Sequence, residues 1–186
     1  MHLSVAGFTT MNFKNSLLVI VILAAAVGGF FLLRSSPQNH RQMQNSSIAD
    51  KVLALQLEDY NGSNIPLSDF KGRPLVINSW AAWCPFCRKE LVDFAAAQKE
   101  FGDKVTIIAV DRAETRETAK KYTDEIGVTE DMIFLLDPRD IFYQSIGGFS
   151  MPETIFIDKS GAVSIHERGP MDLEEMRQKI QQLISQ

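Results

Sequence analysis

The segment from residue 74 to residue 101 constrains the fold most, because it places both cysteines of the chain where a strand gives way to a helix. Residues 74–80, PLVINSW, are a largely apolar run of strand length, which predicts a buried strand. From Pro85 onward, a spacing of three and four residues predicts a helix that ends before Gly102, with Leu91, Phe94, Ala95, Gln98 and Phe101 on one face. The junction reads Cys84-Pro85-Phe86-Cys87. A buried strand followed at once by a helix needs further strands beside it, so the segment indicates a layered α/β domain.

The remainder of residues 50–186 continues this alternation. An edge strand is predicted over Val52–Leu57, before a turn at residues 59–62. Further strands are predicted over residues 105–110, 132–136, 153–157 and 162–165, and helices over 114–126, 140–146 and from Asp172 onward. Asp158-Lys159-Ser160-Gly161 is a hairpin signal between the last two strands. This order predicts an α/β fold in which a central mixed sheet is flanked by helices.

The N-terminal part of the chain differs from the rest, because residues 17–33 contain no polar side chain. As a helix this run would span about 25 Å, near the lower limit for crossing a bilayer. We predict an N-terminal tail (1–15), a transmembrane anchor (16–34) and a flexible linker (35–49). A cleaved signal peptide is the main alternative for the apolar run, since residues 24–26 are small, and a buried core helix is a third.

Composition narrows the classes of partner. The net charge is −4 and no block of basic residues is present, so no nucleic acid is expected as a partner. The two cysteines are too few for a disulfide framework. The three histidines, His2, His40 and His166, lie far from Cys84 in the sequence, and no metal site is predicted from their spacing.

The cysteine pair can be a structural staple, a metal clip or a redox reagent. A disulfide that closes a four-residue loop stabilises a fold by only about 2 kcal/mol in the chain-entropy treatment, which disfavours the staple. Two thiolates can hold Cu(I), but the aromatic residues Trp80, Trp83 and Phe86 crowd the pair and Pro85 stiffens it. The redox reading accounts best for the position of the pair.

A redox role assigns different tasks to the two cysteines. Pro85 suits the first position of a helix, which places Cys84 at the cap, where free N–H groups and the helix dipole favour the thiolate. Arg88, four residues on, adds positive charge on the same helix face. Cys87 lies one turn inward and is expected to be less accessible. Cys84 is therefore expected to attack and Cys87 to resolve the mixed disulfide.

These residues resemble a known family. The stretch from Trp80 to Glu90 resembles the active-site segment of membrane-tethered, extracytoplasmic thioredoxin-fold proteins of the TlpA/ResA type, and it is similar to the cytochrome c maturation thioredoxins of the CcmG/DsbE type. The resemblance runs from residue 52 to residue 184 and includes residues 67–72 and 148–158. It implies a thioredoxin-like fold.

The resemblance also implies roles for residues far from the cysteines. Met151-Pro152 matches the position where the family has a cis proline facing the disulfide, and the Met151 thioether would lie against Cys84. Without the resemblance, Pro152 is a turn proline at a strand start. Trp83 would pack beside the pair, or else serve as an ordinary core aromatic.

Two glutamates are further candidates. Glu90, three residues after Cys87, matches a family glutamate that modulates the proton of the second cysteine, and its alternative is a surface glutamate. Glu153 matches the Pro-Glu-Thr of the CcmG-type proteins and by this resemblance would also reach the site; its alternative is a glutamate without a role there. Asn78 stands where cytosolic thioredoxins bury an aspartate, and it cannot act as a base.

The expected function is that of an extracytoplasmic thiol–disulfide oxidoreductase anchored in the bacterial cytoplasmic membrane. By resemblance, it reduces disulfides in partner proteins, apocytochrome c or another metalloprotein precursor among them, with oxidation as the less favoured direction. A membrane thiol donor would reduce the cysteine pair again after each reaction, without a bound cofactor. Pro85-Phe86 would tune the reduction potential of the pair. A copper-site assembly protein is the alternative from another class. A peroxiredoxin-like peroxidase is the enzyme alternative, although its Pro-x-x-x-Thr-x-x pattern is absent.

Overall fold

The computed structural model describes residues 48–186, whose centre is a seven-stranded sheet in the order β2-β1-β5-β4-β3-β6-β7. Strands β3, β4 and β5 are mutually parallel, whereas β6 and β7 on one side and β1 and β2 on the other pair antiparallel. The strands are β1 (Gln56–Asp59), β2 (Asn64–Pro66), β3 (Leu75–Trp80), β4 (Thr106–Arg112), β5 (Ile133–Asp137), β6 (Glu153–Ile157) and β7 (Val163–Arg168). The predicted mixed sheet is confirmed.

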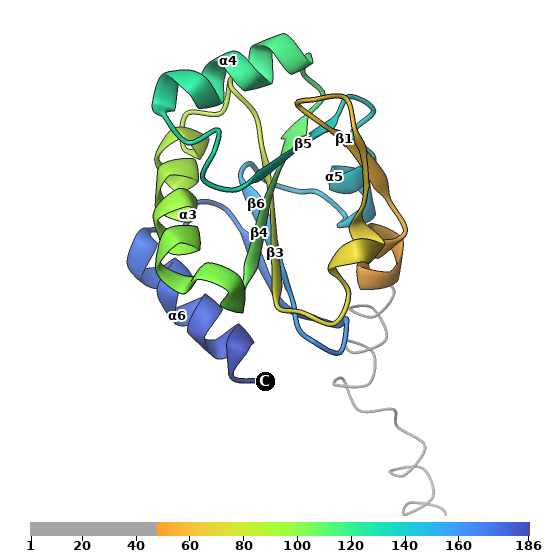
Figure 1. The fold of residues 1–186 in the computed structure, drawn as a ribbon, viewed down its shortest axis with the longest axis vertical. Helices are drawn as coiled ribbons and strands as arrows, with labels where there is room; N and C mark the ends of the chain where they lie inside the picture. Colours follow the sequence, from red (N-terminus) through yellow and green to blue (C-terminus); the bar gives the residue numbers. More distant parts are fainter. Residues whose placement is uncertain (1–47) are drawn as a thin grey trace, which may run out of the picture. The chain divides into compact units, whose positions relative to one another are not determined.

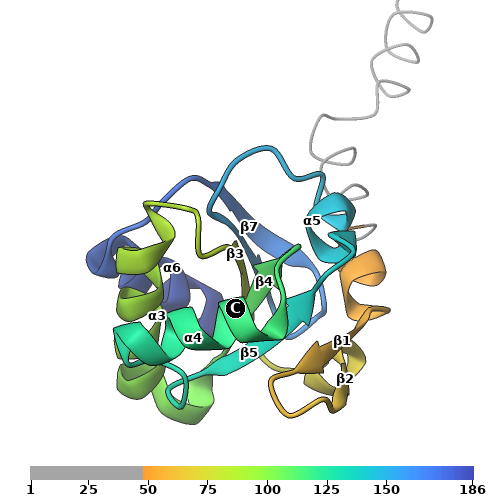
Figure 2. The same cartoon turned by 90° about the horizontal axis from the view of Figure 1, so that it is seen from above.

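Helices cover both faces of this sheet. They are α3 (Cys87–Phe101), α4 (Arg116–Ile126), α5 (Ile141–Ser145) and α6 (Leu173–Ile184), with short 3₁₀ helices η1 (Leu67–Phe70) and η2 (Gly102–Lys104). Figures 1 and 2 agree that α3 and α6 lie on one face, and that α5 lies on the other with the helical residues 48–53. Side chains alternate along β3 and so pack into the core on both faces of the sheet. Val76 packs on the α3 side, and Leu75 and Ile77 pack on the opposite side.

The predicted edge strand over Val52–Leu57 is wrong in its first half. Residues 48–53 are helical, and the strand begins only at Gln56. Ala49, Val52 and Leu53 are buried together in the core, at a spacing of three and four residues that suits a helix and not a strand. Ile48 packs against the same core, so the folded domain reaches two residues into the predicted linker.

The predicted helix ends are largely confirmed by their capping contacts. The Asp172 side chain accepts the Glu175 N–H at 2.9 Å at the start of α6, and Met176, Ile180 and Leu183 of this helix are buried. Gly127 ends α4 in the left-handed conformation, at a φ of 74°, which glycine adopts without steric cost.

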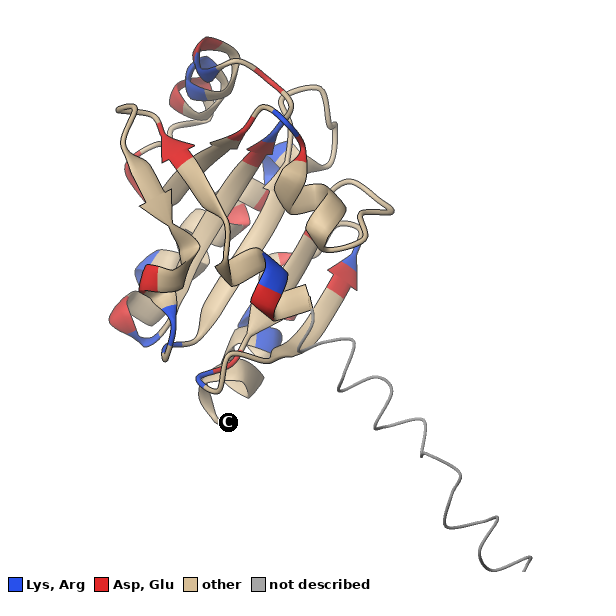
Figure 3. Cartoon of the chain, turned by 90° about the vertical axis from the view of Figure 1, so that its right-hand side faces the viewer, with Lys and Arg blue, Asp and Glu red and all other residues tan. Residues whose placement is uncertain are grey.

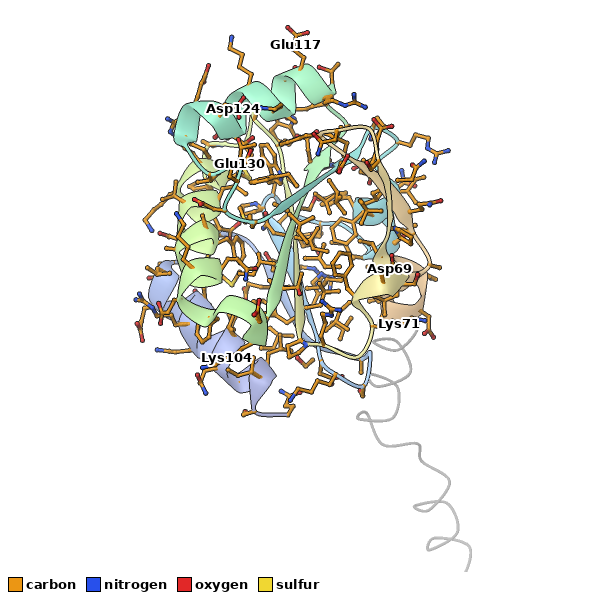
Figure 4. The ribbon with its side chains drawn as sticks, viewed as in Figure 1. Asp69, Lys71, Lys104, Glu117, Asp124 and Glu130 are labelled. Atoms are coloured by element: carbon orange, nitrogen blue, oxygen red, sulfur yellow. A yellow bond between two sulfur atoms is a disulfide. The ribbon has the colours of Figure 1, made fainter. Side chains whose placement is uncertain are left out.

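The tail, the anchor and most of the linker lie outside the described residues. Within residues 48–186, no helix is both long and apolar enough to traverse a bilayer. Along the ribbon of this part, Lys and Arg positions are interspersed with Asp and Glu positions (Figure 3). Charged side chains such as Lys71, Lys104 and Glu117 lie on the outside, while side chains from the sheet and helices fill the interior (Figure 4).

Candidate active site

The two cysteines lie just beyond the end of the central strand β3. Trp80, the last residue of β3, is fully buried, and the chain turns through residues 81–86 before α3 begins. Cys84 and Cys87 are joined by a disulfide, with their Cα atoms 5.4 Å apart. The pair therefore occupies the carboxyl edge of the parallel strands, where ligand and reaction sites of open α/β sheets commonly lie.

The helix begins later than predicted. Cys87, not Pro85, is its first residue, and Phe86 takes the cap position. The Cys87 N–H donates to the Cys84 carbonyl at 3.3 Å, which makes a tight turn of the CPFC segment. The α-helical ladder starts only with the bond from Glu90 N–H to the Phe86 carbonyl at 3.4 Å. Cys84 thus precedes the helix by three residues.

Burial separates the cysteines from their aromatic neighbours. In the disulfide form Cys84 is 1% exposed and Cys87 is 0% exposed, so exposure does not distinguish the two thiols. Trp83 and Phe86 are 60% and 59% exposed. Trp83 is therefore not an ordinary core aromatic.

Arg88 contacts α4. Its guanidinium lies 5.8 Å from the ring centroid of Tyr122, and it lowers the pKa of the Tyr122 hydroxyl against the larger, raising effect of burial. The cation therefore sits between α3 and α4, and its contacts in the oxidised form are with the tyrosine.

Strand pairing brings the segment that contains the late proline to the same end of β3 as the disulfide. β6 runs antiparallel to β3 with Ser79 opposite Glu153, so the residues before β6 reach the end of β3. The Met151–Pro152 bond is cis, as predicted. Met151 packs against the apolar cluster that contains both cysteines, and its sulfur lies 3.9 Å from the Ser79 hydroxyl.

Glu90 lies buried under the helix, one turn after Cys87. It is 1% exposed, which rules out the surface reading. Its Oε2 accepts from Asn78 Nδ2 at 2.9 Å and its Oε1 accepts the Met171 N–H at 3.0 Å. Burial raises the pKa of Glu90 to about 8, although both hydrogen bonds act against the rise. The same Asn78 amide also donates to Thr154 Oγ1 at 2.9 Å, which ties β3, α3 and β6 together.

Glu153 lies on the other face of the sheet. Its neighbour Thr154 meets Asn78 on the α3 side, so the alternation along β6 directs Glu153 away from Glu90. The side chain is fully buried and is paired with His166 and Arg168 of β7. Its carboxylate also contacts the segment immediately before the cis proline.

Sequence reasoning missed two acids at the same edge. Asp111 ends the buried part of β4 beside Trp80, and burial, followed by the neighbouring Glu114, raises its pKa to about 9. Glu114 Oε2 accepts the Ala82 N–H at 2.7 Å and so holds the turn that leads to Cys84. The sequence signal that could have identified Asp111 is its position directly after an apolar strand pattern.

The comparisons with known proteins agree with this geometry. A family model described as Redoxin matches residues 46–184. The thioredoxin-like protein YneN of Bacillus subtilis (strain 168) is 32% identical over 126 residues, which covers 67% of this chain and 73% of YneN. The thiol-disulfide oxidoreductase ResA of Geobacillus thermodenitrificans (strain NG80-2) is 27% identical over 128 residues, which covers 68% of this chain and 72% of ResA.

A solved structure shows the fold. The secreted Mycobacterium tuberculosis disulfide oxidoreductase homologous to E. coli DsbE superposes with a TM-score of 0.65 at 17% identity, covering 72% of this chain and 99% of that chain. The fold is thus thioredoxin-like, as expected. A CxxC pair at this position of such a fold defines a thiol–disulfide oxidoreductase. The chain belongs to the Redoxin family, and the resemblance to ResA-type proteins is confirmed.

Proposed function

We propose that this oxidoreductase works outside the cytoplasm, where it reduces disulfides in partner proteins. The observation that carries the proposal is the Cys84–Cys87 disulfide at the end of β3, in an apolar cluster that Met151 of the cis Met151–Pro152 bond packs against, with the buried Glu90 one turn further along α3. This arrangement supplies a nucleophile, a resolving thiol and a carboxyl with a raised pKa in one place.

The reaction moves two electrons from the reduced pair to the substrate. The Cys84 thiolate attacks one sulfur of the substrate disulfide, so that a Cys84–substrate bond forms and the substrate S–S bond breaks. The Cys87 thiolate then attacks Cys84 Sγ. This step releases the substrate as a dithiol and leaves the intramolecular disulfide that the structure contains. Protons taken up by the two substrate thiolates balance those lost by the cysteines.

Glu90 fits the role of proton acceptor for Cys87. The two residues are three positions apart on α3 and both are buried, so they share the inner face of the helix. The pKa of Glu90, raised to about 8, is close to the ordinary thiol value of about 8.5. Proton transfer between groups of similar pKa costs little free energy, so ionised Glu90 can take the Cys87 proton during resolution, in a fraction of molecules that grows as pH rises toward 8.

The cellular setting of the proposal comes from the N-terminal sequence and the family resemblance. Residues 1–15 would form a tail, 16–34 a single membrane-spanning anchor and 35–49 a linker to the domain at 50–186. Disulfide chemistry is used mainly outside the cytosol, which favours an extracytoplasmic domain. Apocytochrome c or another metalloprotein precursor is the proposed substrate class, and a membrane thiol donor the proposed reductant.

The test uses the full-length chain and a peptide with one intramolecular disulfide, with dithiothreitol as the recycling reductant. The wild type is expected to accelerate peptide reduction, and Cys84→Ser to abolish it. Cys87→Ser is expected to trap a mixed disulfide between Cys84 and the peptide, identified by mass spectrometry. The assignment of the attacking thiol is reversed if the Cys84→Ser variant forms a mixed disulfide on Cys87 and the Cys87→Ser variant forms none on Cys84.

A further inference from the structure

The carboxylate of Glu153 holds the segment that leads to the cis proline. Its Oε2 accepts the N–H groups of Phe149 and Ser150 at 2.7 and 3.1 Å. Its Oε1 lies 2.6 Å from His166 Nε2 and accepts from Arg168 Nε at 3.2 Å. Glu153 is 0% exposed, so all of its hydrogen-bonding capacity is directed at these groups and none at bulk solvent.

This environment requires a carboxylate. Burial raises the pKa of Glu153, but the hydrogen bonds from His166, the Phe149 and Ser150 amides and Arg168 outweigh it, so the pKa lies below its ordinary value. The charged groups around the carboxylate are His166 and Arg168 on β7, with the Tyr143 hydroxyl facing it from α5. A neutral amide at this position would set its NH₂ group against N–H donors, which leaves buried donors without an acceptor.

A second contact holds the same segment from α5. The Tyr143 hydroxyl donates to the Ser150 carbonyl at 3.1 Å. Gly148 lies flat on the Tyr143 ring, where a Cβ would come within 2.2 Å of Cε1. The Arg112 guanidinium stacks 3.6 Å from the centroid of that ring and is fixed by Asp140. Residues 148–150 are thus clamped by Glu153 and Tyr143, while Phe149 projects into solvent, 82% exposed.

We propose that Glu153 is a positioning residue for the reaction of polypeptide disulfides. By fixing the amides of Phe149 and Ser150, it sets the backbone of Met151 beside the disulfide, and it directs the exposed Phe149 toward an incoming chain. The substrate class it serves is a disulfide carried in an extended polypeptide segment, as opposed to a small-molecule disulfide. The proposal rests on the proposed reductase function.

The experiment compares two disulfide probes on the reduced full-length chain. One is a peptide of about twelve residues with a single internal disulfide, long enough to lie along the segment at about 3.3 Å per residue. The other is 5,5′-dithiobis(2-nitrobenzoate), which has no peptide backbone to align. Glu153→Gln is expected to lower kcat/KM for the peptide about tenfold, because a small displacement of the aligning groups is costly to rate. The rate with the small disulfide is expected to change less than about twofold, since Cys84 and Cys87 are untouched.

Asp158→Asn is the matched control. Asp158 directly follows the other end of β6, and its Oδ1 likewise accepts two backbone N–H groups, those of Ser160 and Ala162 at 2.8 and 3.2 Å. It is expected to leave both probes unchanged. Tyr143→Phe is the second variant, in case Glu153→Gln does not fold. It removes the hydroxyl contact to Ser150 and is expected to lower the peptide rate alone by about threefold, the effect of one hydrogen bond.

The outcomes distinguish a failure of the positioning role of Glu153 from a failure of the proposed reductase function. The positioning role is overturned if Glu153→Gln and Tyr143→Phe each lower the rate equally with both probes. It is also overturned if neither variant lowers the rate with either probe. A wild type that reduces the small disulfide but not the peptide overturns the proposed function, whatever the variants do.

Discussion

Asn78 Nδ2 donates to Glu90 Oε2 at 2.9 Å, in a buried contact between the central strand and the helix that carries Cys87. An amide at this position holds a carboxyl group without adding a second titrating charge. The carboxyl with the raised pKa therefore comes from α3, and β3 only orients it.

Glu90 is expected to make stability fall as pH rises. Its pKa in the folded protein is raised from 4.5 to about 8, so between these values the folded state keeps a proton that the unfolded state has lost. The stabilisation is complete below pH 4.5 and is lost as pH rises toward 8, at a cost on the order of 3–5 kcal/mol. Urea unfolding of the oxidised wild type and of Glu90→Gln between pH 4.5 and 8 measures this change in the free energy of unfolding. Parallel pH profiles for the two proteins would show that Glu90 titrates normally.

Glu90→Gln is also expected to slow the resolving step. Without an acceptor for the Cys87 proton, the mixed disulfide on Cys84 should decay at least about tenfold more slowly, since general bases typically contribute more than this. Quenched-flow trapping of the mixed disulfide measures the decay. Glu117→Gln on the exposed face of α4 is the control and should decay at the wild-type rate. Equal decay in both variants removes the proton-acceptor role.

Asn78→Ala is expected to destabilise the domain by about 2–4 kcal/mol, because it removes the buried donor to Glu90 Oε2 and to Thr154 Oγ1. Ser79→Ala, the next residue of the same strand, loses only a 3.9 Å contact to the Met151 sulfur and should cost less than about 1 kcal/mol. Chemical denaturation of both variants at one pH gives the comparison. A similar cost for the two would mean that the Asn78 bridge contributes little.

The reduction potential of the Cys84–Cys87 pair is expected to lie below about −200 mV, in the range of reducing thioredoxin-type proteins. Equilibration with glutathione buffers measures it. A value near −120 mV, typical of strong oxidants, would reverse the proposed direction of electron flow. Exchange of Phe86 for Pro, which leaves both cysteines in place, tests whether the CPFC dipeptide sets this value.

The full-length chain is expected to sediment with bacterial membranes and to resist extraction by high salt, since residues 17–33 are uniformly apolar. Deletion of residues 1–34 should release the domain into the soluble fraction. Recovery of a shortened, soluble protein from the full-length gene would identify the apolar run as a cleaved signal peptide instead.

The sequence by itself determined the local features of this protein. The apolar run of β3, the helical spacing after Cys87 and the Asp172 cap are properties of short windows, and the structure has them at or near the predicted residues. The thiol–disulfide chemistry was readable for the same reason, because Cys84 and Cys87 are only three residues apart.

Tertiary structure alone decided which distant groups meet. Residues 48–53 became a helix because the core on the α5 side buries Ala49, Val52 and Leu53 together, which a short alternating pattern does not reveal. Asn78 and Thr154 are 76 residues apart, and they touch only because β3 and β6 pair antiparallel in one register. The same pairing sends Glu153 to the face opposite Glu90. A shift of one residue would exchange the two faces, so the roles of these acids depend on strand register and not on their own sequence neighbourhood.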